Sequence, residues 1–187
     1  MHICYKFCTG VSMELQFSIS ELSSYLDEVF PQVVNQYKIL TLEPGYAKVV
    51  QNITSENLRP GGTVSGPTIF SLVDIGMYIL LLAHIGKEPL AVTTNCSIDF
   101  LQKPNAGEEM VADCKLLKLG RTLIVGEVLV KALKHEDLLA RSSITYFSQN
   151  FKVIYLMGLF LVRKFQYQSH LLKLISSLKY PVELFHF

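Results

Sequence analysis

The chain has 187 residues, of which 50% are apolar and 18% are charged, a balance typical of one globular domain and not of a disordered chain. Its formal net charge of +1 gives no basic field that would indicate a nucleic-acid partner. The four cysteines lack a CxxC pair and the N-terminus lacks the features of a signal peptide, so we expect a reduced, cytoplasmic protein.

The N-terminal quarter of the chain predicts a helix followed by a hairpin. Residues 18–37 place apolar side chains at helical spacing, with Ser20 as the candidate N-cap and Pro31 as the residue that kinks or splits the helix. The next run, KILTLEPGYAKVVQNI, has an EPGY turn between β-rich segments and predicts a strand, or a hairpin with an irregular middle. Residues 1–17 are expected to be a poorly ordered extension.

A long apolar helix is predicted next, over residues 67–85. Pro67 suits its first turn and Gly86 supplies its C-terminal stop. Because the helix is apolar nearly all round, we expect it to be buried on most sides, although its uninterrupted apolar run is too short to span a bilayer. His84, near its end, is expected to act as a partner for the negative end of the helix dipole.

Four β-like runs follow, joined by short linkers that are compatible with antiparallel neighbours. They are PLAVTTNCSIDFL, EEMVADCKLLKLG, RTLIVGEVLVKAL and LLARSSITYFS. This order of elements predicts an α+β fold in which an antiparallel sheet wraps around one long central helix. We expect that domain to occupy residues 18–149.

Residues 150–187 form an atypical C-terminal extension with a more basic composition than the rest of the chain. Three interpretations stay open: a helix packed on the domain, a nonhomologous or out-of-frame extension, and a membrane-surface segment. The apolar run VIYLMGLFLV is too short to span a bilayer as a helix. Membrane contact is therefore the least favoured of the three.

The start of the long helix, RPGGTVSGPTIFSLVD, holds the two groups with the clearest chemical potential. The first turn of a helix offers unpaired N–H groups that stabilise a developing negative charge, and Gly66 lets a carbonyl approach them closely. Asp74, two turns further on, lies among apolar residues and shares a helix face with Ser71. Such a carboxylate suits a general base or a nucleophile. The alternative is a structural role, in which Asp74 only accepts hydrogen bonds from Ser or Thr hydroxyls.

Residues 40–149 resemble the hotdog-fold acyl-CoA thioesterases of the phenylacetate-pathway (PaaI-like) type. The resemblance rests on GGTVSGPTIFSLVD, on AVTTNCSIDFLQKPNAGEEMVADCKLLKLGRTLIVGEVLV and on LLARSSITYF. It implies a hotdog fold and a hydrolase that cleaves acyl-CoA thioesters to free acid and coenzyme A. It also implies active sites at the interface of a homodimer, which can pair into a homotetramer.

The resemblance further implies roles for individual residues. Gly66 matches the glycine whose amide polarises the thioester carbonyl, and Asp74 matches the acidic base or nucleophile. Thr93 falls near a strand position where relatives use a hydroxyl to orient the attacking water. The His-Gly-Gly of the family is Ser-Gly-Pro here, so Ser65 stands at the histidine position and completes the predicted catalytic set. Arg59 lies about where many relatives carry Asn.

The candidate substrate-binding residues are polar or small residues near the helix start, on the following strand and at a basic turn: Arg59, Gly62, Ser71, Asn95, Lys118 and Arg121. Lys118 and Arg121 suit the phosphates of coenzyme A, although a solvated hairpin end explains them equally well. Arg59 either contacts substrate or braces the loop before the helix.

Several other chemistries lack support in the sequence. No His and Cys spacing predicts a metal site, and the chain has neither a P-loop lysine, a Rossmann fingerprint nor a GxSxG elbow. We therefore expect no metal and no cofactor beyond the coenzyme A of the substrate. A noncatalytic acyl-CoA or lipid-binding module is the alternative function. A hotdog dehydratase is a weaker one, because no His and Asp occur at the spacing it needs.

Overall fold

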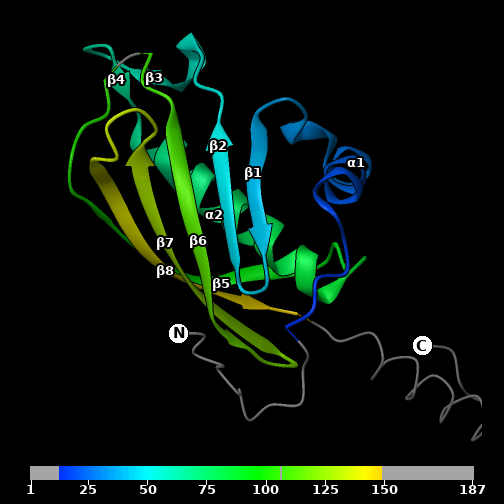
Figure 1. The fold of residues 1–187 in the computed structure, drawn as a ribbon. Coiled ribbons are helices and arrows are strands. Elements are labelled where there is room, and N and C mark those ends of the chain that lie inside the picture. Colours follow the sequence, from blue (N-terminus) through cyan, green and yellow to red (C-terminus); the bar gives the residue numbers. More distant parts are fainter. Residues whose placement is uncertain (1–12, 106, 149–187) are drawn as a thin grey trace, which may run out of the picture. The chain divides into compact units, whose positions relative to one another are not determined.

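In the computed structural model, which describes residues 13–105 and 107–148, one antiparallel sheet curls around a long helix (Figure 1). That helix is α2 (Gly66–Ile85), and the strand order is β1-β2-β6-β7-β8-β5. The six strands are β1 (Tyr37–Glu43), β2 (Tyr46–Gln51), β5 (Val92–Phe100), β6 (Met110–Leu119), β7 (Leu123–Ala132) and β8 (Leu138–Phe147). The predicted α+β architecture is confirmed. The predicted extension at residues 150–187 lies outside the described residues.

The first helix, α1 (Ile19–Val29), is shorter than the predicted segment because Pro31 interrupts it, as expected. A single 3₁₀ turn, η1 (Pro31–Val33), follows. The N-cap is Ser18 and not the predicted Ser20. Ser18 and Glu21 form a capping box, in which the Ser18 N–H donates to the Glu21 carboxylate at 2.8 Å. The glutamate three residues after Ser18 was the signal for this cap.

The segment before α1 is part of the domain. Three apolar side chains in it pack against the core, and the Gln16 N–H donates to the carbonyl of Ala83 in α2 at 2.7 Å. The three are Met13, Leu15 and Phe17. The predicted poorly ordered extension therefore reaches too far along the chain, because apolar contacts hold residues 13–17. Residues 1–12 lie outside the described part.

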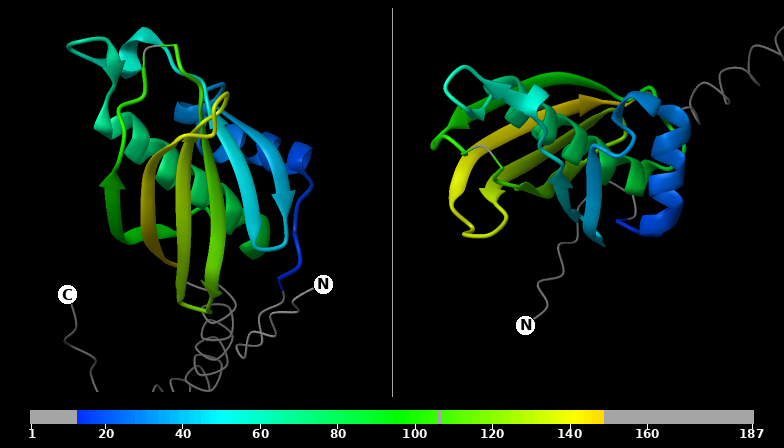
Figure 2. Two further views of the ribbon diagram at one scale, coloured as in Figure 1. Left: turned by 60° about the vertical axis from the view of Figure 1, so that its left-hand side comes forward. Right: turned by 90° about the horizontal axis from the view of Figure 1, so that it is seen from above.

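Helix α2 begins and ends almost where the sequence predicts. Pro67 lies in its first turn, and Gly86 follows its last residue with a φ of 83°, a conformation that favours glycine. By length and composition this helix could span a membrane, but 78% of its most apolar window is buried in the protein. Gly76 allows close packing, since a Cβ there would lie 2.9 Å from Cys114 Sγ on β6. The apolar composition is thus explained by the sheet around the helix (Figure 2).

Strand β5 corrects the prediction that the four C-terminal strands follow one another as neighbours. It pairs with β8, with Thr93 opposite Tyr146, and it has no pairing with β6, the next strand in sequence. Strand β6 pairs instead with β2, so the β1–β2 hairpin extends the meander and β5 takes the free side of β8. A short linker permits a hairpin but does not require one, because register with a distant strand decides the pairing.

A small hairpin leads into α2. Its strands are β3 (Leu58–Arg59) and β4 (Thr63–Val64), preceded by the short 3₁₀ helix η2 (Ser55–Asn57). Pro60 lies in the turn, and the two following glycines have φ angles of 96° and 73°. The Gly62 N–H closes the turn on the carbonyl of Arg59 at 3.1 Å. This geometry explains the PGG sequence and places Arg59 next to the start of α2.

His84 is buried and serves as a neutral hydrogen-bonding group, which corrects its predicted role at the helix dipole. Its Nε2 accepts the Gly45 N–H at 3.0 Å, and its Nδ1 lies 2.9 Å from the carbonyl oxygen of Leu80. With Nε2 accepting, the ring hydrogen lies on Nδ1 and is donated to Leu80. Burial lowers the pKa of His84 below its ordinary value, partly offset by the bond to Leu80.

Acidification is therefore expected to destabilise the fold through His84. Because its pKa is lower in the folded state, the unfolded chain binds the proton first, and stability falls as the pH drops below about 6.5. His84→Gln, whose amide oxygen can accept the Gly45 N–H, should cost no more than about 1 kcal/mol at pH 7.5. Urea unfolding at pH 7.5 and 5 should show a smaller loss on acidification for the variant than for the wild type. Equal losses would contradict this assignment.

Candidate active site

Asp74 is half-buried on α2, and two hydroxyl groups from neighbouring strands hold its carboxylate. Thr93 Oγ1 of β5 donates to Asp74 Oδ1 at 2.6 Å, and the Tyr146 hydroxyl of β8 donates to the same oxygen at 2.6 Å. No described residue makes a hydrogen bond to the second oxygen, Oδ2. The structure thus brings the predicted Asp74 and Thr93 together and leaves one carboxylate oxygen for a water or a ligand.

These contacts bear on the structural alternative for Asp74. The carboxylate does accept a hydrogen bond from the Thr93 hydroxyl, as that alternative requires. However, a purely structural carboxylate would be expected to use both oxygens, because each has lone pairs to satisfy. Asp74 also lies at the end of the uncovered stripe of α2, with Pro67, Phe70 and Ser71 at helical spacing before it. Its free oxygen is therefore placed where a second molecule can reach it.

The start of α2 presents one free backbone donor, at Gly66. Pro67 has no N–H, the Thr68 N–H donates to Ser65 Oγ at 3.3 Å, and the Ile69 N–H donates to the Ser65 carbonyl at 3.3 Å. Within the described contacts, only the Gly66 N–H of this turn is left without an acceptor. The positive end of the helix dipole lies at the same place. Gly66 is thus suited to bind a developing oxyanion, as predicted.

Ser65 caps the helix, and its contacts do not support a catalytic role. Its Oγ accepts the Thr68 N–H and lies 2.8 Å from Thr68 Oγ1. Thr68 Oγ1 donates its own hydrogen to the carbonyl of Asn57 at 3.0 Å, so the Ser65 hydroxyl hydrogen is donated to Thr68. The residue at the histidine position of the family therefore orders the helix start here, and the predicted catalytic assignment of Ser65 has no observation behind it.

Ser71 belongs to a partly buried chain of polar side chains that also includes Tyr37 and Gln51. Its Oγ lies 2.6 Å from the Tyr37 hydroxyl, which accepts a hydrogen bond from Gln51 Nε2 at 3.2 Å. Burial raises the pKa of Tyr37, and the charge of Asp74 raises it further, so Tyr37 stays protonated near neutral pH. Ser71, a predicted substrate-binding residue, is thereby fixed one turn before Asp74.

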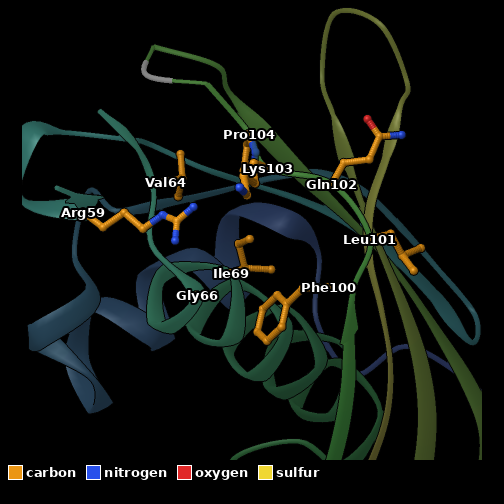
Figure 3. Close-up of a pocket in the computed structure, with 9 residues that line it drawn as sticks. All are labelled: Arg59, Val64, Gly66, Ile69, Phe100, Leu101, Gln102, Lys103 and Pro104. Atoms are coloured by element: carbon orange, nitrogen blue, oxygen red, sulfur yellow. The ribbon is translucent and has the colours of Figure 1, made fainter. Parts of the chain in front are cut away.

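A pocket of about 380 Å³ opens beside the start of α2 (Figure 3). Its floor is apolar, and the side chains of Arg59, Gln102 and Lys103 supply its polar groups. The Phe100 ring lies against Gly66, 3.6 Å from where a Cβ would be. The remaining lining residues are Val64, Ile69, Leu101 and Pro104. The pocket therefore combines apolar walls, two cationic side chains and the free N–H of the helix.

Arg59 braces the loop before the helix, as one of its two predicted alternatives requires, and its contact with substrate stays a prediction. Its Nε donates to Thr63 Oγ1 at 2.8 Å across the β3–β4 hairpin, which braces the loop. Its guanidinium also extends over the start of α2 and lines the pocket (Figure 3). Bracing through Nε leaves the two terminal nitrogens of the guanidinium available for a ligand.

The other predicted binding residues do not line this pocket. Gly62 forms the turn of the small hairpin, and Asn95 lies exposed on β5 beside a register shift. Lys118 and Arg121 lie at the β6–β7 turn, at the far end of β6 from the pocket residue Pro104. Within one chain they do not converge with Gly66, and their predicted contact with coenzyme A stays a prediction.

The sequence did not point to most residues of this site. Among them are Tyr146, which contacts Asp74, and Phe100, Gln102 and Lys103, which line the pocket. Their sequence signals were weak: TYF reads as an ordinary strand end, and QKPNAG reads as a hairpin linker. Among the described residues, no three His, Cys, Asp or Glu side chains are grouped so that they could hold a metal ion.

Comparison with known proteins identifies the family. The model of the thioesterase superfamily matches residues 61–139. A crystal structure from Silicibacter sp. TM1040, of a protein provisionally named a thioesterase, is 49% identical; the match covers 72% of this chain and 94% of that one, with a TM-score of 0.68. A provisionally named esterase of Archaeoglobus fulgidus is 35% identical over 83 residues, 44% of this chain and 52% of the relative. The chain thus spans about half of that curated relative.

Other solved structures share the fold at lower identity. The phenylacetic acid degradation protein PaaI of Thermus thermophilus, solved as a mutant, is 25% identical, with 63% of this chain and 98% of that one covered and a TM-score of 0.56. A Streptococcus mutans protein solved with acetyl-CoA is 24% identical, with 62% and 90% covered and a TM-score of 0.56. The chain described here belongs to the thioesterase superfamily of hotdog-fold proteins.

Proposed function

We propose that this protein hydrolyses acyl-CoA thioesters, with Asp74 as base or nucleophile and the Gly66 N–H as the donor that polarises the carbonyl. The observation that carries the proposal is the arrangement at Asp74. Two hydroxyl groups hold Oδ1, and Oδ2 is left without a hydrogen bond from the described residues. A carboxylate held in this way is preorganised to take a proton from water.

We further propose that each active site uses Gly66 of one subunit and Asp74 of another. The two residues are eight positions apart on one continuous helix, and a rise of 1.5 Å per residue separates them by about 12 Å. A water activated by Asp74 must lie about 3 Å from the carbonyl carbon it attacks, and a separation of about 12 Å along the helix favours a site in which the two groups come from different chains. A second copy of the chain can supply the missing group.

The free edge of β5 is the surface we propose for that second copy. β5 is the last strand of the sheet, and no described strand pairs with its outer edge. The described residues include nine large apolar side chains that are exposed, and five of them lie in this region. Val92 and Phe100 lie on β5, Leu90 and Leu101 lie beside its ends, and Phe70 lies on the uncovered stripe of α2. Such an edge favours pairing with another chain, and a two-fold dimer would create two identical sites. A dimer of dimers is compatible with the same arrangement.

The proposed reaction follows from these groups. Asp74 Oδ2 takes a proton from water as the water oxygen bonds to the thioester carbonyl carbon, and Thr93 or Ser71 orients that water. The carbonyl electron pair moves to oxygen, where the Gly66 N–H and the helix dipole stabilise it. Collapse of the intermediate breaks the C–S bond, and the thiolate takes a proton from the Asp74 carboxyl or from solvent. In the nucleophilic variant, Oδ2 itself bonds to the carbonyl carbon and the C–S bond breaks to release the coenzyme A thiolate. Water then cleaves the resulting anhydride to the free acid and the Asp74 carboxylate.

Coenzyme A is the thiol that the pocket suits best. Arg59 and Lys103 can bind phosphate groups, and the apolar floor suits the pantetheine arm or the acyl chain. The Streptococcus mutans protein of the same fold was solved with acetyl-CoA. Neither a metal nor a further cofactor enters the proposed reaction, and we propose a cytoplasmic site of action, where acyl-CoA substrates would be met.

An acyl-CoA panel tests this function. Wild-type protein is expected to release free thiol from at least one of the short-chain, medium-chain and aromatic acyl-CoAs, with a kcat of about 1 s⁻¹ or more. A thiol-reactive chromophore measures the release, and size-exclusion chromatography with light scattering measures the oligomer. Tight binding of acyl-CoA by calorimetry without turnover of any of them, in folded dimeric protein, would favour the noncatalytic module instead.

A further inference from the structure

Tyr146 is the second-to-last residue of β8, and its hydroxyl contacts Asp74 in the interior of the domain. Its side chain is 2% exposed. In the β5–β8 pairing it lies opposite Thr93, so the two hydroxyls that bind Oδ1 come from directly paired positions of neighbouring strands. The pairing of β5 with β8, which has a register shift directly after Thr93, therefore determines where the carboxylate of Asp74 is held.

The Tyr146 hydroxyl has one hydrogen and two acceptors within reach, both on Asp74. It lies 2.6 Å from Oδ1 and 2.8 Å from the main-chain carbonyl oxygen of the same residue. A buried phenol needs one acceptor, and the main-chain oxygen alone would satisfy it. The shorter contact is to the carboxylate, and a hydrogen bond to a charged acceptor is stronger than one to a neutral carbonyl. The hydrogen therefore belongs on Oδ1 when Asp74 is ionised.

Burial raises the pKa of Tyr146, and the charge of Asp74 raises it further. The phenol consequently keeps its hydrogen near neutral pH and remains a donor to Asp74. Two further titratable side chains interact with this pair, Tyr37 of β1 with Asp74 and Cys96 of β5 with Tyr146. Among the described residues, no ion pair reaches Asp74.

We propose that Tyr146 is a positioning residue for the reaction: it holds Asp74 Oδ1, stabilises the ionised carboxylate, and so directs Oδ2 toward the attacked thioester. The inference rests on the proposed function of Asp74. Of the two residues that hold Oδ1, Tyr146 contributes more than Thr93, because Tyr146 is buried whereas Thr93 is exposed. A hydrogen bond away from water is stronger and loses less to competition by solvent.

Tyr146→Phe removes the hydroxyl and keeps the ring that packs beside Tyr78. For the best acyl-CoA of the panel, kcat should fall about 10- to 100-fold, the rate equivalent of one hydrogen bond to a charged group, while KM stays within about twofold. The acid limb of the pH profile should move to higher pH, because the ionised carboxylate loses a donor. Wild-type kcat and an unmoved acid limb in the folded variant would overturn the proposal.

Tyr78→Phe is the matched control. The Tyr78 hydroxyl is also on a buried tyrosine and donates to the carbonyl of Pro89 at 3.0 Å, without contact to Asp74. Both variants lose one buried hydrogen bond, and Tyr146→Phe should lose more stability than Tyr78→Phe because its acceptor is charged. Only Tyr146→Phe should change kcat and the pH profile. Equal effects of the two substitutions on both quantities would reduce Tyr146 to a packing residue and contradict the proposal.

A measurement that does not need turnover separates this proposal from the proposed function. In ¹³C NMR of protein with labelled aspartate, the Asp74 carboxyl signal is identified as the one that is absent from Asp74→Asn. This signal should titrate at higher pH in Tyr146→Phe than in either the wild type or Tyr78→Phe. If wild type hydrolyses nothing but this shift is found, the function fails and the contact stands. In the wild type itself, the Tyr146 hydroxyl proton should give a downfield signal that moves as that carboxyl titrates. A signal that ignores the titration would place the hydrogen on the main-chain oxygen and overturn the proposal without any variant.

Discussion

Asp74→Asn is expected to lower kcat by about 10²- to 10⁴-fold, the range typical of a lost general base, with little change in folding. The amide oxygen of Asn can take the place of Oδ1 and accept both the Thr93 and the Tyr146 hydroxyls. The amide nitrogen then stands at Oδ2, where it can neither take a proton nor attack a carbonyl. The substitution thus removes the chemistry and retains the structural contacts.

Steady-state thiol release and urea unfolding on the same preparations check this result. The unfolding free energy should change by no more than about 1 kcal/mol. Asp27→Asn, the same change at an exposed position of α1, is the control and should retain wild-type kcat. If Asp74→Asn kept wild-type turnover, the structural alternative for Asp74 would be correct. Asp74→Ala should be inactive and less stable as well, because it also takes an acceptor from two hydroxyl groups.

Mixing two inactive variants is expected to restore about a quarter of the wild-type activity, since half of the randomly assorted dimers would be mixed and each would have one complete site. One variant is Asp74→Asn. The other is Gly66→Pro with Pro67→Ala, which removes the Gly66 N–H and keeps a proline in the first turn. Ser65 has a φ of −77° and a ψ of 152°, an extended conformation that a following proline accepts.

The mixing experiment has its own control, Pro67→Ala alone, which keeps the Gly66 N–H and should remain active. Subunits are exchanged by dilution in mild denaturant and refolding, and the recovered dimers are assayed for thiol release. Activity in the mixture combined with inactivity of both parents would assign Gly66 and Asp74 to different subunits. A mixture that stays inactive, although mass spectrometry shows mixed dimers, would place both groups in one chain and contradict the 12 Å argument.

Much of the fold could be predicted because its signals are local. Pro67 and Gly86 mark the ends of α2, and Pro31 ends α1, through conformational restrictions that act on the nearest residues. The apolar composition of residues 67–85 predicts burial without reference to any partner. The error at the start of α1 was small: the N-cap is Ser18 and not the predicted Ser20, because Ser18 forms a capping box with Glu21.

The candidate site was predicted only in part. Asp74 and Gly66 stand out by residue type and position, and the resemblance pointed to Thr93, which does contact Asp74. Ser65 was assigned by alignment to a histidine, whereas its hydroxyl is engaged with Thr68 at the helix cap. Alignment position identifies which backbone site a residue occupies, and only its hydrogen bonds show what its side chain does.

The sequence by itself therefore determined the hotdog architecture, the ends of α2, and the presence of a carboxylate and a free helix N–H in one motif. The tertiary structure decided the rest. In the structure β5 lies at the edge of the sheet beside β8, and not beside β6. Because of that placement, Thr93 and Tyr146, which are 53 positions apart in the sequence, both donate to the same oxygen of Asp74. Strand order and register depend on contacts between distant segments, so no local pattern could have shown them.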